Sequence, residues 1–231
     1  MSAARAIATR IVYVYAHHRY ALLFFSLLAT IAVGPLLQAA GANVHLIEFL
    51  LAVNLLAAVY PGVVLTRQRP ILLYVLGAAL LLRWVTLRMG LRELSELSLA
   101  MWTAIAALAA VRSLRFAMSS VQVHGEHLYA ALSTYLLAGV FWAIAYVALE
   151  SQAPGSLQMG GATMSSFDFP DAIYFSFVTL ATLGYGDVLP VGSIARGLAI
   201  FEAIVGQLYL AVMVARLVGL RTMTEGPPEP H

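Results

Sequence analysis

The hydropathy of this chain is organised into long apolar runs separated by short polar connections. Runs of about 20 residues are long enough to cross roughly 30 Å of bilayer hydrocarbon as helices. Six runs of this kind lie at Tyr20–Gln38, Val44–Thr66, Ile71–Leu87, Leu94–Val111, Leu128–Glu150 and Val191–Gly219. A shorter apolar run, Ala172–Ala181, precedes the last of them. The pattern predicts an all-α membrane protein with six transmembrane helices.

The composition supports a place in the bilayer. Hydrophobic residues make up 61% of the chain and charged residues 10%, which leaves too little polar surface to cover a soluble globule. The chain has no cysteine, so disulfides, thiolate metal sites and thiol catalysis are excluded.

The arginines indicate the orientation of the spans, because basic residues near helix ends favour the cytoplasmic side. With six spans, one side receives Arg5, Arg10, Arg19, Arg67, Arg69, Arg112, Arg115, Arg216 and Arg221. The other side receives Arg83, Arg88, Arg92 and Arg196, together with Glu93, Glu96, Glu150, Asp168, Asp171 and Asp187. Both termini are therefore expected in the cytoplasm, in a prokaryotic cell membrane, and the acidic bias would raise the local cation concentration outside.

The first span has a second interpretation, since an apolar run that ends in small residues also describes a secretory signal peptide. Arg19 precedes the run and Ala39–Ala42 follow it. The run is longer than the roughly 7–15 residues usual in a signal, which favours a retained span.

The segment Thr182–Asp187, with the sequence Thr-Leu-Gly-Tyr-Gly-Asp, lies between the short apolar run and the last span. Gly184 and Gly186 can leave the right-handed backbone region without a steric penalty, so successive carbonyl groups can face one axis. Pro170 stands near the start of the preceding run, where proline loses no needed hydrogen bond and favours a helix N-terminus.

A Gly-Tyr-Gly segment framed in this way, with Thr179 before it and Pro190 after it, resembles the selectivity filter of the potassium channel superfamily. The resemblance is to a six-transmembrane, one-pore-loop bacterial channel without a voltage-sensing arginine ladder. It implies a homotetramer, because three further copies of the chain are needed to close a ring of filters. It also implies a membrane protein surrounded by lipid, without enzymatic activity, nucleic-acid binding or a cofactor, with K⁺ as the permeant ligand.

The resemblance implies roles for named residues. The filter would consist of Thr182, Leu183, Gly184, Tyr185 and Gly186. The supporting residues would be Tyr174, Val178, Thr179 and Asp187. Most family members carry valine or isoleucine where this chain has Leu183. Some bacterial channels carry, where this chain has Val178, a glutamate that braces the filter aspartate, so here the Tyr174 hydroxyl is left as a partner for Asp187.

The last span would supply the cavity and the gate, by the same resemblance, through Glu202, Gly206, Gln207, Leu210, Val214 and Val218. Gly206 corresponds to a bending point of the inner helix, and close helix packing is an equally open interpretation. Glu202 is a carboxylate well inside a span, which by default indicates function. The alternative is a buried and protonated acid that is hydrogen-bonded to the pore helix, the re-entrant helix expected over Ala172–Ala181, and it stays open.

We expect five regions along the chain. They are a cytoplasmic segment at 1–19, a peripheral four-helix domain at 20–115, a linker at 116–127, a pore domain at 128–220 and a disordered tail at 221–231. No arginine lies between Leu94 and Val111, so a steep response to membrane voltage is not expected.

Several points stay open at this stage. His124 and His127 suit a pH sensor, a metal site or simple interfacial contacts. The stimulus for gating is undefined, and a separate regulatory subunit is one candidate. A less selective monovalent cation channel and a non-channel six-span protein, such as a membrane enzyme, remain as alternative functions.

Overall fold

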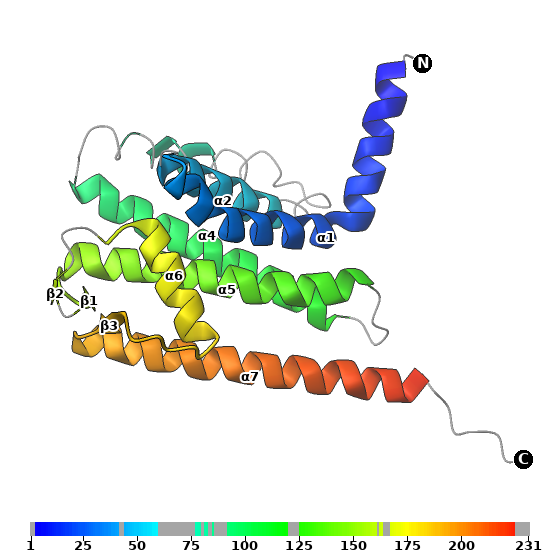
Figure 1. Ribbon diagram of the computed structural model, residues 1–231. Helices are drawn as coiled ribbons and strands as arrows, with labels where there is room; N and C mark the ends of the chain where they lie inside the picture. The colour runs from blue at the N-terminus through cyan, green and yellow to red at the C-terminus, as the bar shows by residue number, and fades with distance from the viewer. Residues whose placement is uncertain are drawn as a thin grey trace, which may run out of the picture.

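The computed structural model of the chain is dominated by long helices that run nearly side by side (Figure 1). It describes residues 3–41, 44–59, 77–79, 81–82, 85, 92–119, 125–160, 162–163 and 167–224. The helices are α1 (Ala3–Ala39), α2 (Val44–Val59), α4 (Arg92–Met118), α5 (Gly125–Gln152), α6 (Phe169–Leu180) and α7 (Ser193–Thr224).

Four helices of the described residues are long and apolar enough to cross a membrane. These candidate spans are His18–Leu36, Glu96–Met118, Gly125–Gln152 and Ser193–Arg216. The apolar part of α2, Ile47–Val59, is shorter, as is α6. Most of the predicted third span, Ile71–Leu87, lies outside the described residues. A mostly helical protein is therefore confirmed, and the number of six spans stays a prediction.

Two predicted boundaries shift. Helix α4 continues to Met118, so the linker expected at 116–127 begins with helix. Helix α1 extends toward the N-terminus beyond the predicted span, with a kink at His18, where φ is −122°. The kink turns the first part of α1 away from the bundle (Figure 1).

Three short strands correct the all-α prediction. They are β1 (Leu157–Met159), β2 (Ala162–Thr163) and β3 (Val188–Pro190), in the antiparallel order β2-β1-β3. Met159 pairs with Val188, directly after the Thr182–Asp187 segment. The connection from α5 to α6 is therefore anchored, through the pairing of β1 with β3, to the residues that follow Asp187.

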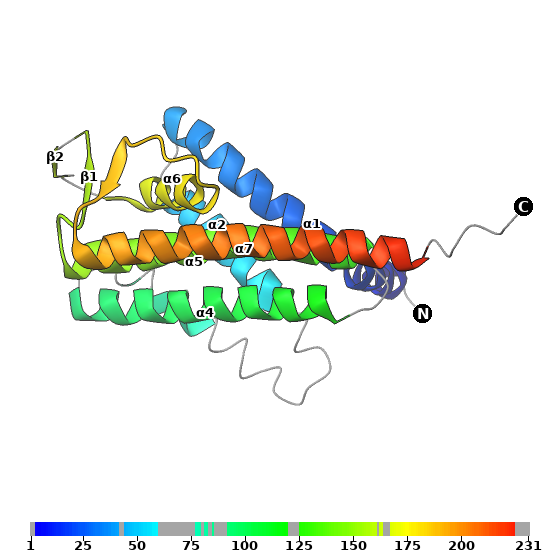
Figure 2. The same ribbon diagram turned by 90° about the horizontal axis from the view of Figure 1, so that it is seen from below.

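Helix α5 is the centre of the packing, with contacts to α1, α4, α6 and α7 (Figures 1 and 2). The larger apolar core joins α5 to α1, α2 and α4. A second apolar cluster joins α5 to α6 and the strands, and it consists of Trp142, Tyr146, Leu157, Phe175, Leu180 and Val188. Helix α6 thus rests on α5 across the direction of the other helices.

The peripheral helices are also tied together by polar contacts. The buried side chain of Asn54 on α2 donates to Thr30 Oγ1 on α1 at 3.1 Å. Arg112 on α4 donates to the carbonyl oxygen of Val59, the last residue of α2, at 3.0 Å. A cation at the C-terminal end of a helix is favourable, because it meets unpaired carbonyl groups and the negative end of the helix dipole.

A glycine on α5 sets the distance between α5 and α6. A Cβ atom at Gly139 would lie 2.5 Å from Cζ of Phe177, which is closer than carbon atoms can approach. Small residues at helix interfaces allow this close approach inside membranes. Gly139 therefore fixes the depth at which α6 lies in the protein.

We predict that Gly139→Ala destabilises the protein by about 1–3 kcal/mol, because the added methyl group overpacks the α5–α6 contact. The measurement is thermal unfolding of the purified protein in detergent. Gly197→Ala is the matched control, since Gly197 is also in a helix and a Cβ atom there would meet nothing within 4 Å. Equal unfolding temperatures for the two variants would contradict the packing role of Gly139.

Candidate functional site

Helix α6 points its C-terminal end at the Thr182–Asp187 segment. Its N-terminus has the expected features: Asp168 is the extended N-cap residue, Pro170 is in the first turn, and Asp171 follows. At the other end, the backbone N–H of Thr182 donates to the carbonyl oxygen of Thr179 at 2.9 Å, and that of Leu183 to Val178 at 2.8 Å. The chain therefore leaves α6 through a tight, hydrogen-bonded turn.

The backbone of the segment alternates in handedness. Thr182, Gly184 and Gly186 have φ values of +56°, +59° and +79°, whereas Leu183 and Tyr185 do not have positive φ. In an extended strand of uniform handedness, successive residues point to opposite sides. Reversing the handedness at every second residue turns successive carbonyl groups toward one side, which is the arrangement that a row of oxygen ligands would require.

Thr182 is the part of this pattern that the sequence did not reveal. The two glycines were expected to adopt positive φ, but a β-branched residue rarely does. Such a conformation costs about 1–3 kcal/mol and persists only where the surroundings enforce it. Here the Thr182 N–H is held by α6, and Gln207 on α7 donates from Nε2 to Thr182 Oγ1 at 3.3 Å.

The exit of the segment is braced by Asp187. The Tyr174 hydroxyl on α6 donates to Asp187 Oδ2 at 2.7 Å, and the N–H of Val188 donates to Oδ1 at 3.0 Å. The ring of Tyr174 also stacks on that of Tyr185, with centroids 6.4 Å apart and an angle of 11°. The Tyr174–Asp187 contact considered from the sequence is therefore present in the structure.

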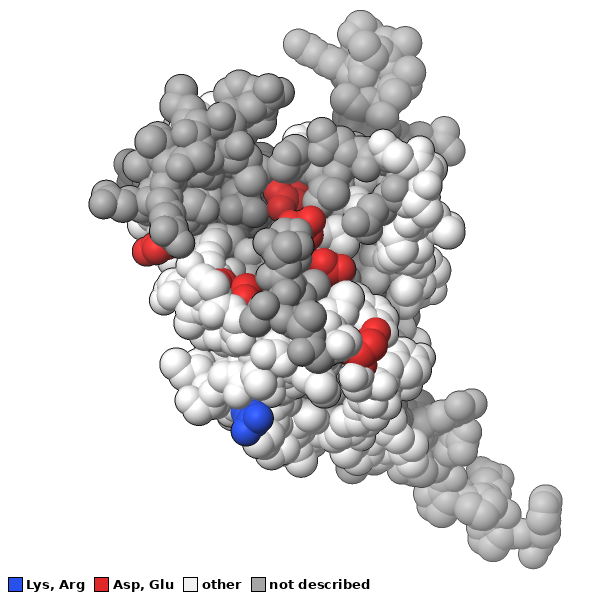
Figure 3. Space-filling view, turned by 60° about the vertical axis from the view of Figure 1, so that its left-hand side comes forward, with Lys and Arg blue, Asp and Glu red and all other residues white. Residues whose placement is uncertain are grey.

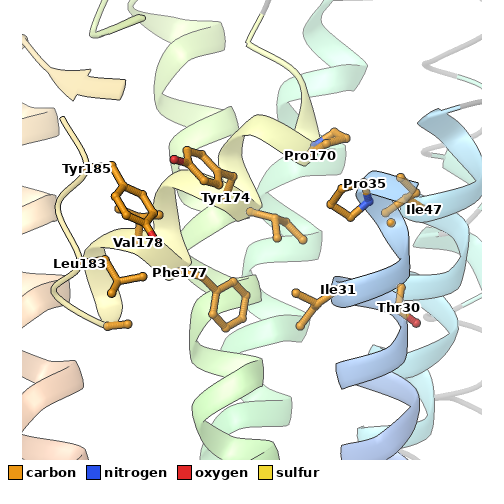
Figure 4. Close-up of a pocket in the computed structure, with 13 residues that line it drawn as sticks. Thr30, Ile31, Pro35, Ile47, Pro170, Tyr174, Phe177, Val178, Leu183 and Tyr185 are labelled. Atoms are coloured by element: carbon orange, nitrogen blue, oxygen red, sulfur yellow. The ribbon is translucent and has the colours of Figure 1, made fainter. Parts of the chain in front are cut away.

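The side chains of the segment are open to the outside of a single chain. Leu183 and Tyr185 are 57% and 67% exposed. They form one wall of an apolar cavity of about 420 Å³ between α6 and α1, whose other walls include Ile31, Pro35 and Phe177 (Figure 4).

Helix α7 presents different residues to α6 and to the outside. A Cβ atom at Gly206 would lie 2.6 Å from the carbonyl oxygen of Leu180, so the glycine lets α7 touch the end of α6. This contact supports the packing interpretation of Gly206, and a hinge there stays a prediction. Gln207, Leu210, Val214 and Val218 are exposed in the single chain, as a cavity lining requires.

The position of Glu202 differs from that of the other residues assigned to the cavity and gate. Its side chain is completely buried. It accepts a hydrogen bond from the Tyr146 hydroxyl on α5 at 2.7 Å and lies 2.6 Å from Ser176 Oγ on α6. The carboxyl group therefore faces the protein interior behind α6 and not the outside of the chain, which fits the alternative interpretation of a buried acid hydrogen-bonded to the pore helix.

The acidic and histidine side chains of the described residues differ in how they are grouped. Acidic side chains gather on the face turned toward the strand-bearing end (Figure 3). Within the described part of the chain, no three His, Cys, Asp or Glu residues are grouped as metal ligands. The ring of His127 stacks on Phe116 with centroids 4.7 Å apart, and His124 lies outside the described residues.

The electrostatics at Asp187 follow from its hydrogen bonds. The Tyr174 hydroxyl, with a smaller contribution from the Val188 N–H, holds the pKa of the Asp187 carboxyl below its ordinary value. A lowered native pKa stabilises the fold above the ordinary carboxyl pKa, and this stabilisation is lost as the pH falls through the native pKa.

We predict that Tyr174→Phe raises the Asp187 pKa toward its ordinary value, since the bond to the charged form is removed. The variant should be less stable than the wild type at neutral pH, and the difference should shrink in acid. The measurements are thermal unfolding against pH and an NMR titration of Asp187. Tyr185→Phe keeps the Tyr174 hydroxyl and serves as the control; a stability difference independent of pH would contradict the assignment.

Comparisons with known proteins match the same region. A family model described as an ion channel matches residues 130–221, from α5 to α7. Over 82 residues, 34% of this chain, the sequence is 39% identical to the inward rectifier potassium channel Kirbac3.1 of Paramagnetospirillum magnetotacticum. Two proteins called LctB also match, at 50% identity over 48 residues (21% of this chain) in Bacillus caldotenax and 38% over 82 residues (33% of this chain) in Geobacillus stearothermophilus.

The matches cover 24%, 35% and 59% of the length of these three relatives, less than two thirds of each. No solved structure matches the chain significantly. The comparisons thus concern the segment that contains α5, α6, the Thr182–Asp187 turn and α7. For this segment the resemblance to the potassium channel superfamily is confirmed, because residues 130–221 match the ion channel model and the relatives include a potassium channel.

Proposed function

We propose that this chain is a subunit of a potassium-selective channel that conducts K⁺ passively across the cell membrane. The alternation of positive φ at Thr182, Gly184 and Gly186 is the observation that carries the proposal. An ion that crosses a membrane must exchange its water shell for other oxygen ligands, and a row of backbone carbonyl groups supplies them in potassium channels.

The proposed ligands are the carbonyl oxygens of Thr182, Leu183, Gly184 and Tyr185, with the Thr182 hydroxyl at the inner end. Gly186 allows the chain to leave the row, and Asp187 fixes the exit through Tyr174. Gln207 donates to the Thr182 hydroxyl oxygen, so that oxygen is oriented from the α7 side. K⁺ is the permeant ion, and the proposal includes neither a resident cofactor nor a catalytic step.

Four copies of the chain would form the pore, because one chain supplies one carbonyl row. Apolar exposure supports this assembly: Phe201, Ile204 and Leu208 on α7 are 58%, 52% and 59% exposed in the single chain. The exposed filter residues Leu183 and Tyr185 need a neighbour or water beside them, since irregular backbone at membrane depth must be covered by protein or line an aqueous cavity. Gln207, Leu210, Val214 and Val218 would then surround the cavity and the gate.

The proposed channel is not steeply voltage-gated. Voltage sensing needs charges inside the membrane field, worth roughly 2.3 kcal/mol per charge per 100 mV. Helix α4 has no arginine from Leu94 to Val111, and Arg112 donates to the end of α2. A separate regulatory subunit remains a candidate for the source of gating, and both termini are proposed to be cytoplasmic.

A less selective monovalent cation channel is the second candidate. The observation that favours it is the support of the filter, where Asp187 is braced by a tyrosine hydroxyl and Val178 offers only apolar contacts on its side of α6. A filter with fewer polar braces holds its carbonyl groups less rigidly, and rigidity at the ligands is one proposed source of K⁺ over Na⁺ selectivity.

We predict that the purified protein in a planar bilayer, with K⁺ on one side and Na⁺ on the other, gives a reversal potential near the K⁺ equilibrium potential. Gly184→Ala should move the reversal potential toward zero or abolish the current, because alanine at φ +59° costs about 1–2 kcal/mol and displaces a ligand.

Gly41→Ala is the matched control. Gly41 also has positive φ, +80°, and a Cβ atom there also meets nothing within 4 Å, but the residue lies in the turn after α1. The control should keep the wild-type reversal potential. A wild-type reversal near zero with robust current would favour the less selective channel, and an identical response of the two variants would remove the filter assignment.

A further inference from the structure

A buried polar cluster joins the three helices of the pore segment behind the filter. Tyr146 on α5, Ser176 on α6 and Glu202 on α7 are each 0% exposed. Tyr146 donates to Glu202 Oε2 at 2.7 Å, and Glu202 Oε1 lies 2.6 Å from Ser176 Oγ. Ser176 Oγ also lies 2.8 Å from the carbonyl oxygen of Gly139 on α5.

The hydrogens available in this cluster define the state of the acid. The three contacts need three hydrogens, but the Tyr146 and Ser176 hydroxyls supply one each. The Gly139 carbonyl can only accept, so the Ser176 hydrogen belongs in that contact. If Glu202 were ionised, its Oε1 would then face Ser176 Oγ at 2.6 Å without a hydrogen. A proton on Oε1 satisfies all three contacts.

The environment also disfavours an ionised carboxylate. No arginine of the described chain forms an ion pair with Glu202, whose polar contacts are the two hydroxyl groups. A buried charge without a cationic partner is costly, and more so at membrane depth. Neutral Glu202 has the donor and the acceptor that its two neighbours require.

The cluster lies on one contact line between α6 and α7. Glu202 meets Ser176, and four residues further along each helix Gly206 meets Leu180. A step of four residues advances by about one helical turn, so both contacts lie on the same side of each helix. Leu180 is followed at once by the turn into the filter, where Thr182 receives the Gln207 bond.

We propose that Glu202 carries a proton and is a positioning residue for the filter: as a neutral donor and acceptor it fastens α7 to α6 and, through Ser176, to the α5 backbone. The protonated state rests on the geometry of the cluster alone. The effect on the filter rests on the proposed function, because it requires that the Thr182–Tyr185 carbonyl groups bind K⁺.

The first experiment detects the proton. Infrared spectra of the reconstituted protein at neutral pH should contain the carbonyl stretch of a protonated carboxylic acid, sensitive to deuterium exchange. This band should disappear in Glu202→Gln and persist in Asp187→Asn. A wild-type spectrum without an acid band that depends on Glu202 would overturn the inference.

The second experiment compares a substitution of Glu202 that keeps its hydrogen-bonding groups with one that removes them. Glutamine can donate from Nε2 to Ser176 and accept from Tyr146, so Glu202→Gln should keep the wild-type unfolding temperature and K⁺ current within about twofold. Glu202→Leu leaves the buried Tyr146 hydroxyl without an acceptor and Ser176 Oγ without the donor on Glu202, and its K⁺ current should fall by about tenfold or more. Equal damage by Gln and Leu would overturn the proposal, because it would show that the negative charge is needed.

Further outcomes separate this inference from the proposed function. If Glu202→Leu does not assemble, Ser176→Ala removes the contact between Glu202 and α6, keeps the Tyr146–Glu202 bond to α5, and should lower the K⁺ current in the same direction. A wild-type protein that shows the acid band but has no K⁺ selectivity would refute the proposed function and the effect on the filter, while the proton on Glu202 would stand. A K⁺-selective wild type without the band would refute the proton on Glu202 and leave the proposed function standing.

Discussion

The need to pair every peptide group at membrane depth governs this structure. Helices pair their peptide groups internally. The Thr182–Asp187 segment between α6 and α7 is not helical and does not pair its peptide groups in this way. The N–H groups of Ala181, Thr182 and Leu183 return to carbonyl oxygens at the end of α6, while the carbonyl groups that follow keep no such partner in the turn. The donors at the entry of the segment are thus used within the protein, and the acceptors that follow are the groups proposed to bind a cation.

That arrangement depends on where α6 lies. Two glycines, which have no side chain, let the neighbouring helices approach α6 closely. Gly139 admits the ring of Phe177, and Gly206 admits the carbonyl oxygen of Leu180. Between these two points Ser176 and Glu202 add a directional polar contact, which apolar packing alone does not supply. The short sheet holds the other end, because β3 begins directly after Asp187. The segment is thus fixed at entry, along its back and at exit.

Much of this could be predicted from the sequence, and the gaps have physical causes. Long apolar runs gave the described helices, and Gly184 and Gly186 marked the positive-φ positions because glycine is the residue that tolerates them. Strands of two or three residues carry too few positions for an alternating pattern, so β1, β2 and β3 left no signal. The conformation of Thr182 is imposed by α6 and α7 rather than by its own preference. A hydrogen bond from Glu202 to the pore helix was among the alternatives left open, but the choice of Ser176 and Tyr146 as its partners depends on how three helices pack, which no local pattern specifies.

The left-handed conformation of Thr182 sets two effects of a Thr182→Gly substitution against each other. Glycine would adopt φ +56° freely, so exchange to glycine would relieve the backbone and make the fold easier to reach. Such an exchange would also delete the hydroxyl that Gln207 orients. The strain at position 182 is thus the cost of placing a hydroxyl oxygen, rather than the bare Cα of glycine, beside Gln207 at the end of α6.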